Sequence, residues 1–176
     1  KYRGATPVES QILNDDKNVG VSIMLIDEKL DHGPIIAQYP ISNIQYQIQW
    51  PPTATELRTV CNQVAGKLLI ETIPLWIEGK IKAEVQNENQ ATYTKKITSA
   101  DREIDLSGEP YKNFLKIQAY EAWGTYFFEE RAGKKIRVII KSAEFRNSEL
   151  ILLKVVPEGS REMSYEDFRR GLRESV

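Results

Sequence analysis

Apolar residues near the start of the chain form two short continuous runs, at residues 21–26 and 35–37. Both runs are rich in β-branched side chains, which is typical of buried strands. The acidic segment 27–31 lies between them, and the Gly-Pro pair at 33–34 favours a turn before the second run. The pattern predicts an acidic loop at the mouth of a sheet, with the Asp31 carboxylate held where it can face a cleft.

Helical patterns precede and follow this pair of strands. Residues 7–14 begin with Pro, which suits a first helical turn, and share an apolar face. Thr53 and Glu56 have the spacing of a capping box, and the helix that they open carries one apolar stripe, expected to pack on the sheet. The stripe consists of Leu57, Val60, Cys61, Val64 and Leu68. Pro74 predicts a kink or a break in this helix, and Gly79 predicts its end.

Two stretches lack a strong apolar pattern. Residues 45–52 end in two prolines and are expected to form an irregular connection or an edge strand. Residues 80–90 are polar with weak periodicity, which is typical of a solvent-exposed linker between two packed units.

The second half of the chain is dominated by strand patterns. Residues 124–130 and 135–141 alternate in polarity on either side of a short Gly turn, which predicts a hairpin. A helix near residues 110–118 precedes the hairpin, and a strand at 150–156 and a terminal helix from Ser164 follow it. Many short strands separated by turns favour a small barrel. The fold class predicted is therefore α/β followed by mostly β.

Composition narrows the classes of partner. The 176 residues include 41% hydrophobic and 28% charged side chains, typical of a globular chain, and the net charge of -1 means that any nucleic acid must meet a local basic face. Cys61 is the only cysteine and His32 the only histidine, so we expect no disulfide, no zinc site and no other metal. The single cysteine indicates a reducing cytoplasm. No apolar segment is long enough to span a bilayer, so we expect no membrane partner.

The acidic loop by itself leaves the role of Asp31 open. Asp, His, Gly and Pro are ordinary turn residues, and an Asp in such a connection is more often solvated or capping than catalytic. His32 is a candidate general base, but successive side chains usually point apart, which favours a surface or loop-packing role for it.

Several motifs along the chain resemble the folate-dependent formyltransferase family, within which the similarity is strongest to the enzymes that formylate methionyl-tRNA. The motifs are Arg3-Gly4-Ala5-Thr6-Pro7, Gly20-Val21-Ser22-Ile23-Met24 and Leu30-Asp31-His32-Gly33-Pro34-Ile35-Ile36 near the start, and Thr92-Tyr93-x-x-Lys96-Ile97 and Met163-Ser164-Tyr165-Glu166-Asp167-Phe168 later. The resemblance covers nearly the whole chain and is weakest at residues 38–52.

The resemblance implies a domain plan. Residues 1–79 would be the C-terminal part, or rear half, of a Rossmann-like formyltransferase domain, 80–90 a linker, and 91–176 an OB-like barrel. It further implies that Asp31 is catalytic, together with an Asn and a His of an Asn-x-His segment that the sequence does not contain. A chain that starts at Lys1 without Met is thus expected to be an incomplete and inactive portion.

The resemblance also implies a cosubstrate and partners. The formyl donor would be 10-formyltetrahydrofolate, whose pterin would border the loop at Ile26, Asp27, Glu28 and Leu30. The acceptor would be initiator methionyl-tRNA, met by a monomer in the cytoplasm, or in an organellar matrix if the source is eukaryotic. Candidate RNA-binding residues are Lys95, Lys96, Lys135, Arg137 and Lys141. The alternative functions are an amino-sugar formyltransferase and a non-catalytic RNA-binding remnant. The alternative role of these cations is to form the solvated face of an edge strand, without contact to RNA.

Overall fold

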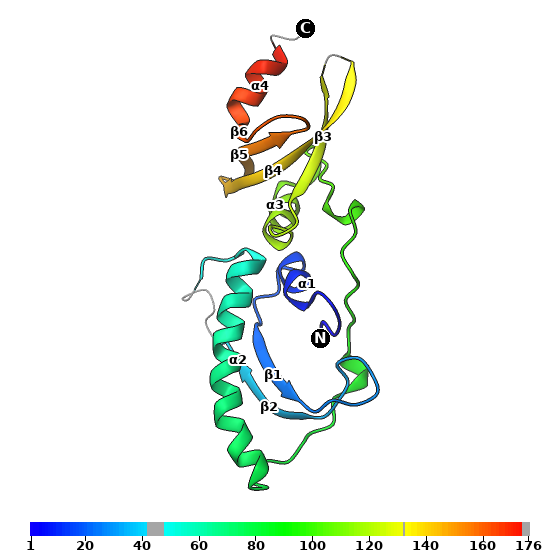
Figure 1. Cartoon of the computed structure of the whole chain (residues 1–176), viewed down its shortest axis with the longest axis vertical. Coiled ribbons are helices and arrows are strands. Elements are labelled where there is room, and N and C mark those ends of the chain that lie inside the picture. The colour runs from blue at the N-terminus through cyan, green and yellow to red at the C-terminus, as the bar shows by residue number, and fades with distance from the viewer. Residues whose placement is uncertain (42–47, 132, 174–176) are drawn as a thin grey trace. The chain divides into compact units, whose positions relative to one another are not determined.

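Two groups of secondary-structure elements follow one another along the chain (Figure 1). The computed structural model describes residues 1–41, 48–131 and 133–173. Within it, contacts divide the chain into two units, Lys1–Lys96 and Ile97–Val176. The start of the predicted connection at 45–52 and one residue of the predicted hairpin turn, Ala132, lie outside the described residues.

The first unit is built on a pair of antiparallel strands and one long helix. Its elements are α1 (Pro7–Leu13), β1 (Gly20–Met24), β2 (Ile35–Pro40), α2 (Ala54–Ile77) and the short η2 (Glu88–Gln90). β1 and β2 pair with Gly20 opposite Pro40 and Ile23 opposite Ala37. Helix α2 packs along both strands (Figure 1). The strands and helices predicted for this unit are thus present.

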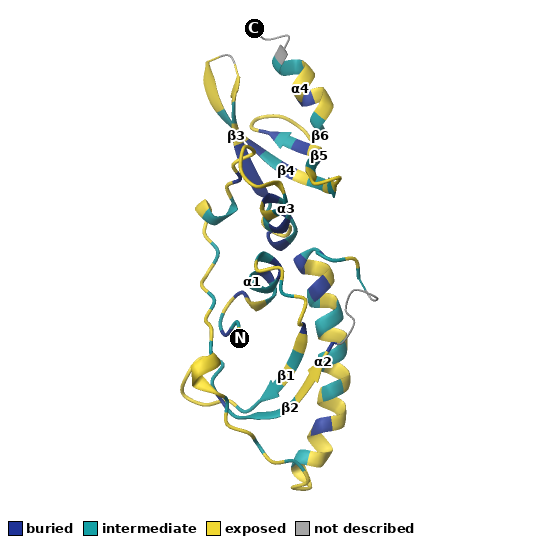
Figure 2. Cartoon of the chain, turned by 180° about the vertical axis from the view of Figure 1, so that it is seen from behind, coloured by how far each residue is buried: buried dark blue, intermediate teal, exposed yellow. Residues whose placement is uncertain are grey.

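The two strands are less buried than their sequence predicts. None of their residues is buried, and the positions run from half-buried to exposed (Figure 2). The expectation of buried strands was wrong for these described residues. The sheet has only two strands there, and among the described helices α2 is the one that packs along both of them, so much of the sheet stays uncovered.

Helix α2 begins at the predicted capping box and continues past the predicted break. The Thr53 hydroxyl accepts a hydrogen bond from the backbone N–H of Glu56 at 3.2 Å, and the Glu56 carboxylate accepts one from the N–H of Thr53 at 2.8 Å. The helix runs through Pro74 to Ile77. Pro74 lies in the last turn, where its missing N–H removes one hydrogen bond close to the end, so no break occurs. Gly79, at φ 70°, follows the end as predicted.

The second unit is an antiparallel sheet flanked by helices. Its elements are η3 (Ala100–Arg102), α3 (Pro110–Ala119), β3 (Thr125–Arg131), β4 (Lys134–Arg146), β5 (Glu149–Pro157), β6 (Met163–Ser164) and α4 (Tyr165–Arg173). The strand order β3-β4-β5-β6 follows the chain, and β3 and β4 form the predicted hairpin with Phe127 opposite Val138.

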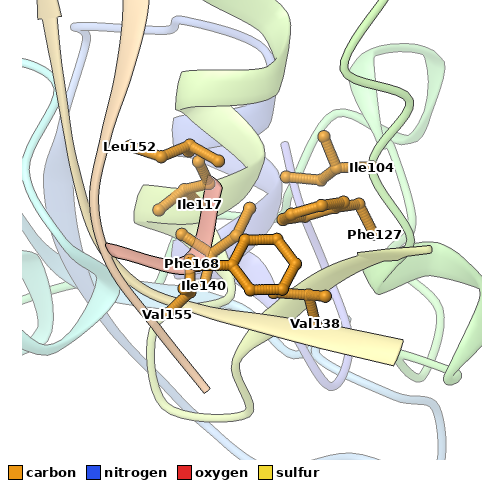
Figure 3. Close-up of a cluster of buried hydrophobic side chains, with 8 residues drawn as sticks. All are labelled: Ile104, Ile117, Phe127, Val138, Ile140, Leu152, Val155 and Phe168. Atoms are coloured by element: carbon orange, nitrogen blue, oxygen red, sulfur yellow. The ribbon is translucent and has the colours of Figure 1, made fainter. Parts of the chain in front are cut away.

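One face of this sheet carries the core of the second unit. Side chains from the sheet, from α3 and from α4 meet there (Figure 3). The cluster consists of Ile104, Ile117, Phe127, Val138, Ile140, Leu152, Val155 and Phe168. The predicted barrel is not found: in the described residues β3 and β6 are the two edges of an open sheet. β6 has two residues and leads straight into α4, so the layer ends in a helix before closure.

None of the helices in the described part of the chain is long and apolar enough to cross a membrane.

Candidate functional site

The acidic loop between β1 and β2 is closed at its base and open at its tip. The N–H of Leu25 donates to the carbonyl of Pro34 at 2.9 Å, which ties the two ends together. At the tip, the Asp27 carboxylate accepts the N–H of Lys29 at 3.0 Å, a local turn of the kind that Asp favours. The side chains of Ile26 and Leu30 are 98% and 65% exposed. The loop thus presents apolar side chains and backbone outward.

Asp31 lies half-buried on this loop in the left-handed backbone region. Its φ is 50°, a conformation that is costly for residues with a side chain, although Asp tolerates it better than most. Its Oδ2 accepts a hydrogen bond from the N–H of Gly4 at 2.7 Å. No described residue donates a hydrogen bond to Oδ1. One carboxylate oxygen is therefore anchored and the other is open to a further donor.

Arg3, next to Gly4, is a buried cation at the centre of a hydrogen-bond network. Its guanidinium donates to Glu88 from Nη2 at 2.8 Å and from Nη1 at 3.1 Å, and to the Tyr93 hydroxyl at 3.1 Å. Nε and Nη2 also donate to Oε1 of Gln86, at 3.2 and 2.8 Å. The paired Glu88 carboxylate raises the pKa of Arg3 above its already high range. The charge is thus neutralised within the site and is not a surface cation.

His32 lies between two carboxylates. Its Nδ1 is 2.6 Å from Asp27 Oδ2, and its Nε2 is 3.4 Å from Glu88 Oε1. The hydrogen bond from His32 lowers the pKa of Asp27, and the hydrogen bond from Arg3 lowers the pKa of Glu88. His32 therefore links the loop tip to the segment around Glu88, in agreement with a loop-packing role.

The pairing of Asp27 predicts a pH dependence of stability. A carboxylate whose pKa is lowered by folding stabilises the fold above its unfolded pKa, about 3.9 for Asp, and this contribution is lost as the pH falls through the lowered folded value. We expect Asp27→Asn to be less stable than the unmodified chain at pH 6, and the difference to shrink as the pH falls below about 3.9. Urea unfolding at several pH values measures it.

The matched control for this pH dependence is Glu28→Gln, because Glu28 is exposed on the same loop without a hydrogen bond in the described chain. Unfolding curves of Asp27→Asn that stay equally far below the unmodified chain from pH 6 to pH 3 would contradict the assigned pairing.

Gly4 allows the close approach that brings Asp31 to the N-terminal segment. Its φ is 120°, and a Cβ there would lie 2.8 Å from the Thr94 hydroxyl oxygen. The N–H of Thr94 donates to the carbonyl of Arg3 at 2.7 Å, so the strand-like segment after η2 runs directly beside the Arg-Gly pair. Only a glycine fits without displacing that segment.

The predicted RNA-binding residues are divided between the two units. Lys95 and Lys96 are exposed at the end of the first, and Lys135, Arg137 and Lys141 are exposed on β4 in the second. On β4, Lys135 Nζ lies 4.2 Å from the ring centre of Phe128, and the Arg137 guanidinium lies 5.4 Å from that of Tyr126.

A hollow of about 1120 Å³ lies elsewhere in the first unit, by α1 and by the ends of β1 and β2 that are far from the acidic loop. Asp31 does not line it. Among the described residues, no group of three or more His, Cys, Asp and Glu side chains could hold a metal ion.

Sequence reasoning did not single out Gln86 and Glu88, and it named Arg3 only as part of a family motif. Gln86 and Glu88 belong to the segment interpreted as a linker, yet they contact the Arg3 and Asp31 region inside the first unit. Residues 84, 86 and 88 alternate along the sequence, which is the spacing of side chains on one side of an extended segment. The backbone of Glu84 pairs with Ile35 of β2. This alternation was the signal in the sequence that could have indicated a segment lying beside the sheet.

Comparison with known proteins agrees with the predicted resemblance. Residues 1–73 match the formyl transferase family. The chain is 34% identical to the methionyl-tRNA formyltransferase of Roseiflexus sp. (strain RS-1), over 98% of this chain and 58% of that protein. The chain thus spans about three fifths of the length of that relative.

Solved structures share the fold at low identity. An N-formyltransferase from Helicobacter canadensis, in complex with folinic acid and dTDP-3-aminofucose, is 22% identical with a TM-score of 0.61, over 83% of this chain and 52% of that one. HypX from Aquifex aeolicus, in complex with tetrahydrofolic acid, is 15% identical with a TM-score of 0.65, over 99% of this chain and 34% of that one. Residues 1–73 thus belong to the formyl transferase family, and the sequence matches to methionyl-tRNA formyltransferases extend over nearly the whole chain.

Proposed function

We propose that the full protein transfers a formyl group from 10-formyltetrahydrofolate to the amino group of initiator methionyl-tRNA. The observation that carries the proposal is the Asp31 carboxylate, anchored through Oδ2 on Gly4 with Oδ1 open, on a loop of a formyl transferase sequence. The relatives named methionyl-tRNA formyltransferases support the choice of acceptor.

The loop tip has the features needed beside a pterin ring. Ile26 and Leu30 offer exposed apolar side chains to a flat ring, and the backbone groups of Ile26, Glu28 and Leu30 make no hydrogen bond to described residues. Exposed backbone donors and acceptors on a constrained loop suit the polar edge of such a ring. When bound, the folate supplies the formyl group.

Asp31 is the candidate catalytic residue. Attack of an amine on a formyl carbon builds negative charge on the carbonyl oxygen, and a proton must leave the amine. A carboxylate cannot stabilise that oxygen itself, but Oδ1 can hold a neighbouring imidazole in its protonated, donating form or orient a water. The bond from Gly4 restrains the carboxylate through Oδ2 and so limits the directions that Oδ1 can take.

We further propose that β4 contacts the tRNA backbone. Lys135, Arg137 and Lys141 are exposed on one strand, and the rings of Phe128 and Tyr126 hold the first two in place. Cations at such spacing can follow a phosphate chain in a salt-dependent way. An aromatic and basic strand face favours RNA over a small acceptor.

The decisive experiment offers the full protein two acceptors. With 10-formyltetrahydrofolate as donor, we expect formylation of initiator methionyl-tRNA and none of a nucleotide-linked amino sugar. The double variant Lys135→Ala, Arg137→Ala should raise KM for the tRNA about tenfold and weaken the dependence of KM on salt, since each lost phosphate contact removes nearly one counterion from the slope.

Lys112→Ala is the control for this experiment, because it removes an exposed cation of the same unit from α3. If only the amino sugar is formylated, the proposed tRNA acceptor is wrong and the proposed formyl transfer is still correct. RNA binding without transfer to either acceptor would indicate the non-catalytic remnant.

A further inference from the structure

The backbone at Asp31 needs external support. A residue with a side chain at φ 50° is strained by about 1 kcal/mol or more, and such conformations persist only where neighbouring groups fix them. The anchor from Gly4 reaches only the carboxylate. A second set of bonds must therefore hold the peptide groups of the loop.

Gln86 supplies those bonds from a distant part of the chain. Its Nε2 donates to the carbonyl of Asp31 at 3.1 Å and to the carbonyl of Gly33 at 2.7 Å. The two carbonyls lie on either side of His32, so one amide group spans the turn. Both N–H bonds of the amide are used in this way.

The orientation of the Gln86 amide is itself fixed. Its Oε1 accepts two hydrogen bonds from Arg3, whose side chain is 5% exposed and is held by Glu88 and Tyr93. Because a guanidinium only donates and carbonyl oxygens only accept, the amide can satisfy both sides in one orientation alone. The partly buried amide therefore transmits the position of a buried cation to the loop.

Arg3 and Gly4 connect the two supports. The Arg3 side chain fixes the loop carbonyls through Gln86, and the next residue along the chain donates its N–H to the Asp31 carboxylate. The Arg3-Gly4 dipeptide thus holds both the backbone of Asp31, through Gln86, and its side chain, directly. A shift of either support moves the open oxygen Oδ1.

We infer that Gln86 is a positioning residue for Asp31, which holds the carboxylate in the geometry for formyl transfer without touching the substrates. The inference rests on the proposed function. Misplacement of a reacting group by about 1 Å can cost on the order of a hundredfold in rate, so the effect should fall on kcat.

The substitution Gln86→Glu tests this selectively. A carboxylate still accepts the bonds from Arg3, but it places an acceptor against the carbonyls of Asp31 and Gly33 in place of a donor. In the full protein we expect kcat to fall about 10- to 100-fold with KM values within about twofold. Amide hydrogen exchange in the peptide spanning residues 26–34 should become faster than in the unmodified protein, while exchange in the second unit stays the same.

Gln90→Glu is the matched control, because it makes the same chemical change at an exposed position of the same segment. If Gln86→Glu keeps the kcat of the unmodified protein, with or without faster exchange in the loop, the inference is overturned. The proposed function still stands in that case as long as Asp31→Asn is inactive. Full activity in Asp31→Asn would instead remove the proposed function. Should Gln86→Glu not fold, Gln86→Met, which loses both sets of bonds without adding charge, decides by the same two readouts.

Discussion

Asp31→Asn is expected to lower kcat for formyl transfer by the full protein by about a hundredfold to ten-thousandfold, the range for groups that assist proton transfer. The amide oxygen of Asn can still accept the N–H of Gly4, so the loop keeps its anchor. What is lost is the negative charge at Oδ1, which in the proposed mechanism holds a proton on a neighbouring imidazole. The KM values for donor and acceptor should change little, because Asp31 acts on the transition state.

Steady-state formylation, with donor and acceptor each varied, measures this effect. Glu71→Gln is the control, since the Glu71 side chain is exposed on α2 and makes no hydrogen bond or ion pair with the described residues. A pH profile adds a second readout: the variant should lose the limb that reports the carboxylate-supported proton donor. Equal kcat in Asp31→Asn and the unmodified protein is incompatible with the assigned role.

The sequence predicted those parts of the fold whose causes are local. The capping box at Thr53, the hairpin of β3 and β4, and the acidic loop between two apolar runs each depend on residues within about ten positions of one another. Asp31 was singled out as a candidate for the same reason. Its loop carries its own turn residues, and the family motif around it is continuous.

The parts that were missed depend on residues far apart in sequence. Gln86 contacts Asp31, which is 55 positions away in sequence, and Arg3, which is 83 positions away. The polar sequence around Gln86 does not indicate which backbone carbonyls its side chain binds. The burial of β1 and β2 and the closure of the second sheet likewise depend on which elements cover a face or meet an edge. Periodicity reports the apolar face of a strand but does not name its neighbour.

Gly33→Ala is expected to destabilise the first unit by about 2–3 kcal/mol, as in other substitutions that force atoms into filled space. A Cβ at this position would overlap the backbone carbonyl oxygen of Leu25 and lie 2.8 Å from its carbon. Both atoms are backbone, so no rotamer change relieves the overlap. The closing bond from Leu25 N–H to Pro34 must then lengthen or break, and the Gln86 bond to the Gly33 carbonyl with it.

Gly66→Ala separates this overlap from the general effect of replacing a glycine. Gly66 lies inside α2, and a Cβ added there would meet no atom within 4 Å beyond its own helical turns, so Ala should stabilise the chain by up to about 1 kcal/mol. Urea unfolding of both variants should thus give changes of opposite sign. Because the Gly33 carbonyl is one of the two that Gln86 holds, Gly33→Ala should also lower kcat in the full protein, and stability equal to that of the unmodified chain would show that the loop yields at no cost.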